Sequence, residues 1–161
     1  MADSFYRVYL DASAVGGAHD DEFAAETQAL FARFARGEAQ ALIGPPLLDE
    51  IAAAPERVQE TLRELAERAE ILGISSEAEE LRDAYLAAEV LPARWAGDAL
   101  HVAYATVARA DAIVSWSFKH LVNPQRIRRF SAVNIARGFG LVVILTPGDV
   151  LRALAAETES G

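Results

Sequence analysis

Apolar residues along the chain alternate between short continuous runs and helical spacing, which predicts strands that alternate with helices. Residues 5–10 are rich in β-forming types and stop at Asp11, where small residues and two glycines predict a loop. Apolar positions over 19–36 recur at helical spacing, and Gly37 follows as an expected C-cap. The run 39–43, bounded by a glycine and two prolines, predicts a second buried strand.

The rest of the chain continues this alternation. One amphipathic pattern opens at Pro55 and carries inward residues as far as Leu72, and the next is capped by Ser75 and stopped by Pro92. A strongly apolar helix is expected over 99–109. The other expected elements are strands over 112–115 and 141–145, helices opening at Pro45 and at Thr146–Pro147, and a frayed tail from Glu157 to Gly161.

This order of elements predicts a single α/β domain, with a central, mostly parallel sheet flanked by helices and a core over about residues 5–150. The 161 residues suffice for one hydrophobic core. Cysteine is absent, which excludes disulfides, thiol catalysis and cysteine-based zinc sites. No apolar run reaches the roughly 18 residues of a membrane span, and no basic segment precedes an apolar one at the N-terminus. We therefore expect a cytoplasmic protein without a membrane partner.

The formal charge of −9 argues against broad, nonspecific coating of DNA or membranes. The charge is unevenly distributed, because the stretch from Ala112 to Gly148 has five basic residues and no acidic one. That stretch carries +5 and the rest of the chain −14. It is either a solvated basic face or a strip that faces phosphates.

Functional sites of parallel α/β sheets gather just past the carboxyl ends of the strands. The polar residues at such places are Asp11, Asp49, Glu50, Asp98, Ser115 and Ser117. Carboxylates from three separated segments could meet at one rim, and like charges about 4 Å apart repel by roughly 4 kcal/mol at an effective dielectric of 20. Such a cluster needs a shared proton or a cation. Oxygen ligands alone favour Mg²⁺ or Mn²⁺, which suits phosphodiester hydrolysis.

Each acid also has an ordinary interpretation. Asp98 follows a glycine and can cap a helix, and Glu50 can be a solvated helix residue. Asp11 is harder to explain in this way, because a carboxylate that ends a buried strand needs a partner or an ion. His101, one turn beyond Asp98, is expected to be a helix-face histidine with one polar contact.

Four segments together resemble the PIN-domain ribonucleases, and among them the VapC-like toxins of type II toxin–antitoxin systems. The resemblance covers about residues 5–150. The segments are Tyr9-Leu10-Asp11-Ala12-Ser13, Leu47-Leu48-Asp49-Glu50-Ile51, Gly97-Asp98-Ala99-Leu100-His101-Val102-Ala103, and 110–121, which contains Ser-Trp-Ser-Phe-Lys-His.

The resemblance implies an endoribonuclease that depends on Mg²⁺ or Mn²⁺ and leaves a 5′-phosphate and a 3′-hydroxyl. It also implies a cognate antitoxin protein. Asp11, Glu50 and Asp98 match the catalytic, metal-binding acids, and Ser13 matches the hydroxyl that supports the first acid. Ser117 stands where many PIN domains have a fourth acid, so a second metal ion would be held weakly or only together with substrate phosphate.

The basic stretch offers candidates for RNA contacts. Lys119 and His120 follow the strand over 112–115, so they should lie near the acidic rim. Arg126 and Arg129, three residues apart, would share a helix face and contact RNA phosphates. Trp116 is expected in the core or an interface, with base stacking as the alternative.

Three other functions remain open. A degenerate PIN-like module could bind RNA or a protein partner without cleavage. Ser117, at the position of the fourth acid, is the residue that favours this alternative. A phosphotransfer domain also uses an acid after its first strand, but Ser13 and the lack of an acidic pair ahead of Asp11 argue against it. A scaffold could use the helices over 56–91, which we otherwise expect to form a homodimer or antitoxin surface.

Overall fold

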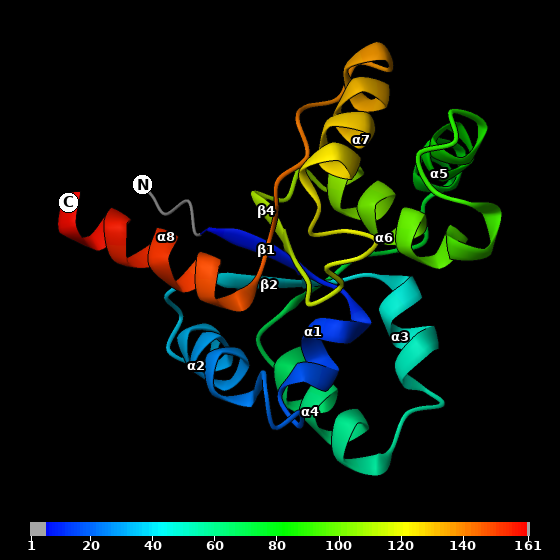
Figure 1. Cartoon of the computed structure of the whole chain (residues 1–161). Coiled ribbons are helices and arrows are strands. Elements are labelled where there is room, and N and C mark those ends of the chain that lie inside the picture. The colour runs from blue at the N-terminus through cyan, green and yellow to red at the C-terminus, as the bar shows by residue number, and fades with distance from the viewer. Residues whose placement is uncertain (1–5, 161) are drawn as a thin grey trace.

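A five-stranded, wholly parallel sheet forms the centre of the chain (Figure 1). The computed structural model describes residues 6–160, so Phe5 of the expected first strand and Gly161 of the expected tail lie outside the described residues. The strands stand in the order β3-β2-β1-β4-β5. Their bounds are β1 Arg7–Leu10, β2 Gln40–Ile43, β3 Glu70–Ile71, β4 Ala112–Val114 and β5 Ile144–Leu145.

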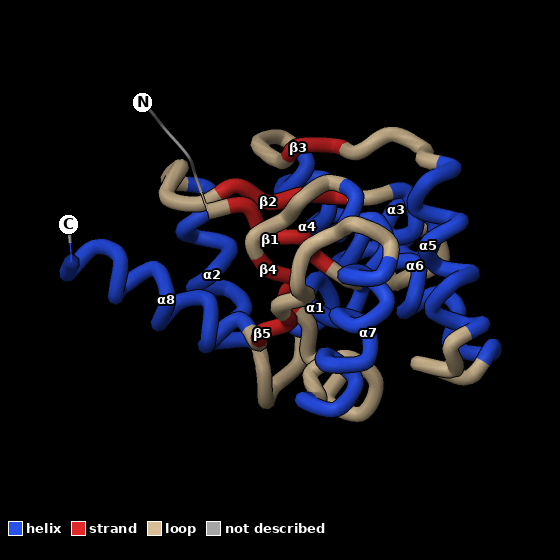
Figure 2. The backbone as a smooth tube through the Cα atoms, turned by 90° about the horizontal axis from the view of Figure 1, so that it is seen from above, coloured by secondary structure: helices blue, strands red, loops and turns tan. Residues whose placement is uncertain are grey.

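Helices cover both faces of this sheet, as Figures 1 and 2 show from two directions. Val8 and Leu10 of β1 face one helical layer and Tyr9 faces the other, because successive side chains of a strand point to opposite faces. The first layer holds α1 Ala12–Gly17, α2 Ala24–Ala35, α3 Pro45–Ile51, α4 Glu56–Ala66 and α8 Pro147–Ser160. The second layer holds α5 Ser76–Ala87, α6 Ala96–Val107 and α7 Pro124–Ala136, with the short 3₁₀ turn η1 Ala93–Trp95 leading into α6.

The path of the chain through the sheet reverses beside β1. From β1 the chain moves outward through β2 to β3, and then it crosses back to β4 on the other side of β1 and continues to β5. Parallel crossovers are almost always right-handed, so a reversal of direction transfers the connecting helices to the opposite face. Open α/β sheets bind ligands at such a reversal, outside the carboxyl ends of the strands. Here that place lies beyond β1 and β4.

The single α/β architecture with a parallel sheet agrees with the expectation from sequence, but three local expectations were wrong. Residues 12–17 form the short helix α1, because Asp11 caps it by accepting a hydrogen bond from the Ala14 amide at 2.9 Å. The helix expected as far as Leu72 ends at Ala66, and the chain then adds β3 to the sheet edge. The last helix continues to Ser160 through most of the tail expected to fray.

The helices over 56–91 turn their apolar faces into this chain's own core. Val58, Leu62 and Leu65 of α4 are buried in the first layer. Leu81 and Tyr85 of α5 are buried in the second layer, on the opposite face of the sheet. The two helices therefore share no continuous apolar surface, and the scaffold hypothesis loses its basis.

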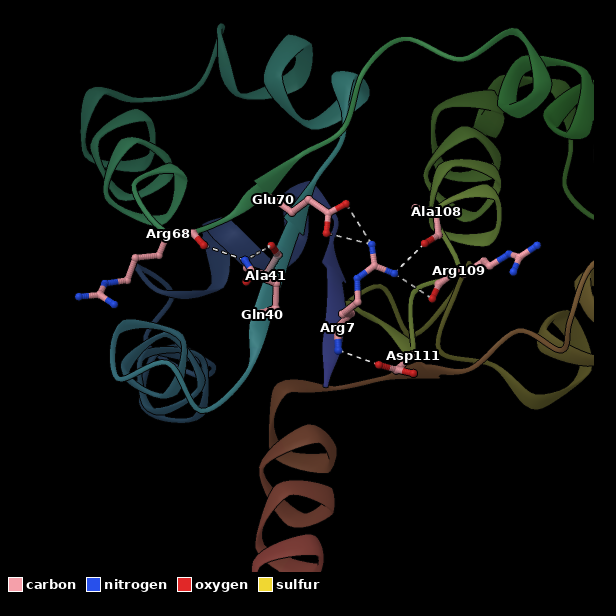
Figure 3. Close-up of polar contacts among 8 residues, drawn as sticks. All are labelled: Arg7, Gln40, Ala41, Arg68, Glu70, Ala108, Arg109 and Asp111. Atoms are coloured by element: carbon pink, nitrogen blue, oxygen red, sulfur yellow. Dashed lines mark hydrogen bonds and ion pairs between the residues drawn. The ribbon is translucent and has the colours of Figure 1, made fainter. Parts of the chain in front are cut away.

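Arg7, the first residue of β1, makes hydrogen bonds to the amino end of β3 and to the turn between α6 and β4 (Figure 3). Its guanidinium donates to the carbonyl oxygens of Ala108 at 2.7 Å and Arg109 at 3.2 Å. It also donates to both carboxylate oxygens of Glu70 on the edge strand β3, at 3.0 Å each. The Arg7 amide donates to Asp111 at 2.7 Å, so Asp111 lies at the sheet end opposite Asp11.

We expect Arg7→Ala to lower the free energy of unfolding by about 1–2 kcal/mol, because two main-chain carbonyls lose a charged donor. The matched control is Arg63→Ala on α4, whose ion pair with Glu56 is largely exposed and is worth about 0.5 kcal/mol or less. Urea denaturation of both variants measures the difference. Equal urea denaturation midpoints for the two variants would show that Arg7 contributes no more to stability than a surface ion pair does.

Candidate active site

Asp11 occupies the carboxyl end of β1 and is only 3% exposed. One carboxylate oxygen, Oδ1, accepts hydrogen bonds from the Ala14 amide at 2.9 Å and the Ser13 hydroxyl at 2.7 Å. The other, Oδ2, accepts from the Ser115 hydroxyl at 2.5 Å. Three donors thus fix this carboxylate at the point where the sheet reverses.

Ser115 connects the end of β4 to the end of β1. Its fully buried hydroxyl donates to Asp11 and accepts from the Ser117 amide at 2.9 Å. The Ser13 hydroxyl in turn accepts from the Trp116 amide at 2.9 Å. Ser115 was noted from the sequence only as a strand-end residue, because its contact with Asp11 spans 104 positions. The Ser117 hydroxyl has no hydrogen bond to any described residue.

Glu50 on α3 is bonded to a buried histidine of α6. Nε2 of His101 contacts a carboxylate oxygen of Glu50, and Nδ1 of the same ring lies 2.7 Å from the Tyr9 hydroxyl. His101 and Tyr9 are 1% and 0% exposed. His101 therefore makes two polar contacts, where the sequence predicted one. A Cβ at Gly44 would lie 2.8 Å from the Tyr9 hydroxyl, so the absence of a side chain there makes room for this contact.

Asp98 in the first turn of α6 faces His120, which follows β4. Oδ2 of Asp98 lies 3.2 Å from Nδ1 of His120. The His120 ring also packs on the Trp95 ring, with centroids 3.9 Å apart. Trp95 belongs to η1 and was not singled out from the sequence, because no spacing signal links it to a residue 25 positions later. Asp98 and Trp95 together fix the orientation of the imidazole.

The carboxylates influence one another's ionisation. Burial raises the pKa of Asp11 above its usual value despite its hydrogen bonds. Burial, and then the negative charge of Asp11, raise the pKa of Asp98. Burial raises the pKa of Tyr9 well above its usual value, and the charges of Asp11 and Glu50 add to this effect. The three acids predicted from sequence therefore act on one neighbourhood around Tyr9 and His101.

The raised pKa of Asp98 predicts a pH-dependent stability. Between the usual carboxyl pKa near 3.8 and the raised value, the folded protein binds more protons than the unfolded chain, so stability falls as pH rises through that window. We expect Asp98→Asn to remove part of this fall and to stabilise the metal-free protein by about 1 kcal/mol at pH 7. Thermal unfolding in EDTA from pH 4 to 7 measures it. A variant as pH-sensitive as the parent would contradict the expectation.

The basic residues proposed from sequence differ in their surroundings. Lys119 is exposed, and His120 contacts Asp98. Arg126 lies in the first turn of α7 and is partly buried. Arg129, which was expected to act with Arg126, donates to the main-chain oxygen of Glu89 at 2.7 Å. Lys119, Arg128, Arg129 and Arg137 are exposed and Arg126 is partly buried, so a solvated basic face and a phosphate-facing strip both stay open.

Trp116 is a core residue, as the favoured expectation had it. Its side chain is 9% exposed and its indole donates to the Thr27 hydroxyl at 2.8 Å. The indole stacks on Phe23 with ring centroids 4.1 Å apart. A Cβ at Gly17 would lie 2.6 Å from the indole, so glycine is required where α1 passes it. The indole is thus not available to stack on an RNA base.

The carboxylate oxygens are the ligand type that a hard cation prefers, but their positions suit one only in part. Oxygen donors suit Mg²⁺ or Mn²⁺, and mutual repulsion between Asp11 and Asp98 favours a cation between them. Within residues 6–160, however, no three Asp, Glu or His side chains converge closely enough to ligate one ion. Glu50 is bonded to His101 instead. The structure thus offers two adjacent carboxylates and a third that is held by a histidine.

The fold is similar to that of a solved structure. A chain of the VapBC2 complex from Rickettsia felis, solved with a DNA fragment from the promoter, is similar with a TM-score of 0.54 and 15% sequence identity. The match covers 86% of this chain and 98% of that chain. No protein-family model and no curated protein matches the sequence. At this identity the likeness concerns the fold, and the chain has a PIN-like α/β fold.

None of the described helices is both long and apolar enough to cross a membrane.

Proposed function

We propose that this chain is a metal-dependent endoribonuclease that serves as the toxin of a toxin–antitoxin pair. The observation that carries the proposal is the buried Asp11 carboxylate, fixed by three donors beside Asp98 at the reversal point of the sheet. Asp11 is buried and Asp98 partly buried, and the pKa values of both are raised. Carboxylates with perturbed pKa values cluster at functional sites. The PIN-like fold supports the proposal, because that family places its acids at this rim.

Asp11, Asp98 and Glu50 are the residues that would hold Mg²⁺ or Mn²⁺. The bound cation would polarise the phosphate and make a water more acidic. The chain's own residues orient these ligands. Ser13 and Ser115 fix Asp11, and His101 directs the Glu50 carboxylate. Ser117, which has no charge, leaves the site with three carboxylates and favours one firmly held ion.

The RNA would approach over the segment that follows β4. Lys119 is exposed there, next to His120 and the start of α7, and no acidic residue occurs between Ala112 and Gly148. Phosphates are attracted to such a surface, and the attraction weakens with salt. Two of the acids contact this segment, Asp98 through His120 and Asp11 through Ser115. The substrate backbone would therefore lie between basic side chains and the carboxylate rim.

An antitoxin protein is the partner that this proposal requires, as the VapBC2 complex carries one. Two large apolar side chains are exposed near the acids, Leu48 at 41% and Phe118 at 51%. Leu48 lies two residues before Glu50 on α3, and Phe118 lies two residues before His120. Apolar residues beside a site are suited to a protein that covers it. We further propose that the chain forms a homodimer and acts in the cytoplasm. Size-exclusion chromatography with light scattering would test the dimer.

A degenerate PIN-like module is the second candidate. The features that favour it are Ser117 at the fourth acidic position and the absence of a three-ligand cluster in the part of the chain that the structure describes. Such a module would bind RNA or a partner and leave RNA intact.

Cleavage of a mixed, structured RNA pool by the purified protein distinguishes the two candidates. We expect cleavage with Mg²⁺ or Mn²⁺, none in EDTA, and 5′-phosphate ends on the products. Circular dichroism of the same samples shows that the protein stays folded in EDTA. A folded protein that binds RNA and cuts it with neither ion would overturn the nuclease proposal and favour the binding module.

A further inference from the structure

A cavity of about 550 Å³ lies at the amino end of β4, at the opposite end of the sheet from the acids. It is bounded by the last turn of α6, the start of β4 and the segment 137–143, which leads from α7 into β5. Leu141 and Val143 on its wall are 76% and 43% exposed, so the cavity is open to solvent. A cavity of this size is in the range that binds small molecules.

The segment that forms one wall of this cavity is fixed by buried polar side chains. The Asn134 amide donates to the main-chain oxygen of Gly140 at 3.0 Å, and the Ser131 hydroxyl accepts from the Val142 amide at 3.0 Å. The Tyr85 hydroxyl donates to the Asn134 side-chain oxygen at 2.5 Å, which holds that amide in one orientation. The cavity is therefore built into the fold, as ligand sites usually are.

Two arginines line the cavity, and nothing in the chain neutralises their charge. The guanidinium groups of Arg109 and Arg137 are exposed and make no hydrogen bond or ion pair with any residue from 6 to 160. Figure 3 shows the Arg109 side chain extending away from Arg7. Glu77, in the first turn of α5, is the acid on this lining. Two arginines against one glutamate give the described lining a net charge of +1.

The rest of the lining is almost wholly apolar. Its other polar side chain is Thr106, whose hydroxyl is already used because it accepts from the Asn134 amide at 3.1 Å. Glycines, alanines and larger apolar side chains make up the remainder, among them Phe139, Leu141 and Val143. Exposed apolar side chains that gather at a cavity mark a place where a ligand covers them. A ligand of this cavity therefore has a substantial apolar part.

A cation is not the ligand that the cavity favours, although α6 and α7 both end beside it and helix C-termini attract positive charge. The main-chain oxygens at these ends already have donors. Those of Ala108 and Arg109 accept from Arg7, and that of Asn134 accepts from the Phe139 amide at 2.8 Å. The two unpaired guanidinium groups therefore set the preferred charge of a ligand, which is negative.

We propose that this cavity binds a small amphiphilic anion. Its apolar body packs on Phe139, Leu141 and Val143. Its head group, a carboxylate or a phosphate monoester, accepts hydrogen bonds from Arg109 and Arg137, because the guanidinium fork matches both kinds of head group. The inference goes beyond the proposed function, since no acid of the candidate active site lines the cavity and the binding needs neither metal nor RNA.

The test is a titration of the isotope-labelled full chain with octanoate in EDTA, followed by the shifts of its backbone amide signals in NMR spectra. We expect a dissociation constant below about 1 mM, with the largest shifts at Gly138 and Gly140. Acetate, which lacks the apolar body, and 1-octanol, which lacks the charge, should each bind at least about fivefold more weakly. Octyl phosphate in place of octanoate distinguishes a phosphate head group from a carboxylate.

Charge variants at the cavity should change the affinity for octanoate in opposite directions. We expect Arg137→Gln to weaken binding about fivefold and Glu77→Gln to strengthen it about twofold, because the first removes an attraction and the second a repulsion. The matched control is Arg128→Gln, which changes the net charge equally on the same helix but lies outside the lining, and its affinity should stay within about 1.5-fold of the parent. Arg137→Lys, which keeps the charge, should retain part of the affinity.

The apolar part of the site has its own variant. Leu141→Gln should weaken octanoate binding severalfold, whereas Phe118→Gln, at an exposed apolar residue near the acids, should not. Thermal unfolding checks that each variant is folded, as expected for exposed positions. Equal affinities in Arg137→Gln and Arg128→Gln would overturn the site, as would shifts centred on Phe118, and 1-octanol that binds as tightly as octanoate would overturn the anionic head group. RNA cleavage takes no part in these measurements, so failure of the nuclease proposal would leave their outcome unchanged.

Discussion

Asp11→Asn is expected to reduce RNA cleavage by about a thousandfold or more while the fold is retained. The carboxylate contributes a negative ligand at the centre of the rim, and a loss of about 4 kcal/mol of transition-state stabilisation corresponds to a thousandfold in rate. Asparagine has nearly the same shape, and its oxygen can still accept from the Ala14 amide and the Ser13 hydroxyl. The Ser115 hydroxyl, which now donates to Asp11, can rotate and accept from the new amide.

The measurement is the initial rate of cleavage at saturating Mg²⁺ or Mn²⁺, with circular dichroism and thermal unfolding on the same samples. The matched control is Asp49→Asn, an exposed acid adjacent to Glu50 that has no partner among residues 6–160. We expect its rate to equal that of the parent. Parental activity in Asp11→Asn would exclude the acid rim as the centre, and an equal loss in Asp49→Asn would point to a general effect of charge.

The sequence predicts most of the fold because its strongest signals are local. The strands β1, β2 and β4 each contain a short run of apolar or β-forming residues, Val8–Leu10, Ala41–Ile43 and Ala112–Val114. The helix α5 begins where Ser75 accepts a hydrogen bond from the Ala78 amide, as a capping serine should. The β3 strand gave no such signal. Its two residues, Glu70 and Ile71, are both exposed, and the strand exists because β2 offers free hydrogen-bonding groups at its edge.

The candidate site was predictable only as far as topology brings its residues together. Asp11 ends a buried strand, a position from which the sheet geometry alone indicates a rim. The contact of Ser115 with Asp11 and that of His101 with Glu50 depend on how α6 and β4 pack beside β1, across 104 and 51 positions of sequence. Their places near the strand ends made Glu50 and Asp98 candidates, although each also had an ordinary helical interpretation, and the resemblance to a family then favoured them. Side-chain geometry shows which histidine each one contacts.

His101→Gln is expected to reduce cleavage about 10–100-fold at low metal concentration, the usual effect of removing a residue that orients a metal ligand. Burial raises the pKa of Tyr9 well above its usual value, so its hydroxyl stays neutral beside Nδ1 of His101, 2.7 Å away. Nε2 on the other side of the ring contacts the Glu50 carboxylate. Tyr9 and His101 thus form a buried chain that directs the Glu50 carboxylate, and shortening it lets the carboxylate turn away.

A positioning role predicts a particular kinetic pattern. The Mg²⁺ concentration for half-maximal activity should rise, while activity at saturating Mg²⁺ recovers most of the parental value. Tyr9→Phe, which removes only the hydroxyl, should show the same pattern with a smaller shift. The control is His19→Gln, since His19 is exposed and contacts Thr61 on α4. A loss in His101→Gln that saturating Mg²⁺ does not restore would instead assign His101 a direct part in the chemistry, because a residue that acts only through Glu50 cannot limit the rate once the ion is bound.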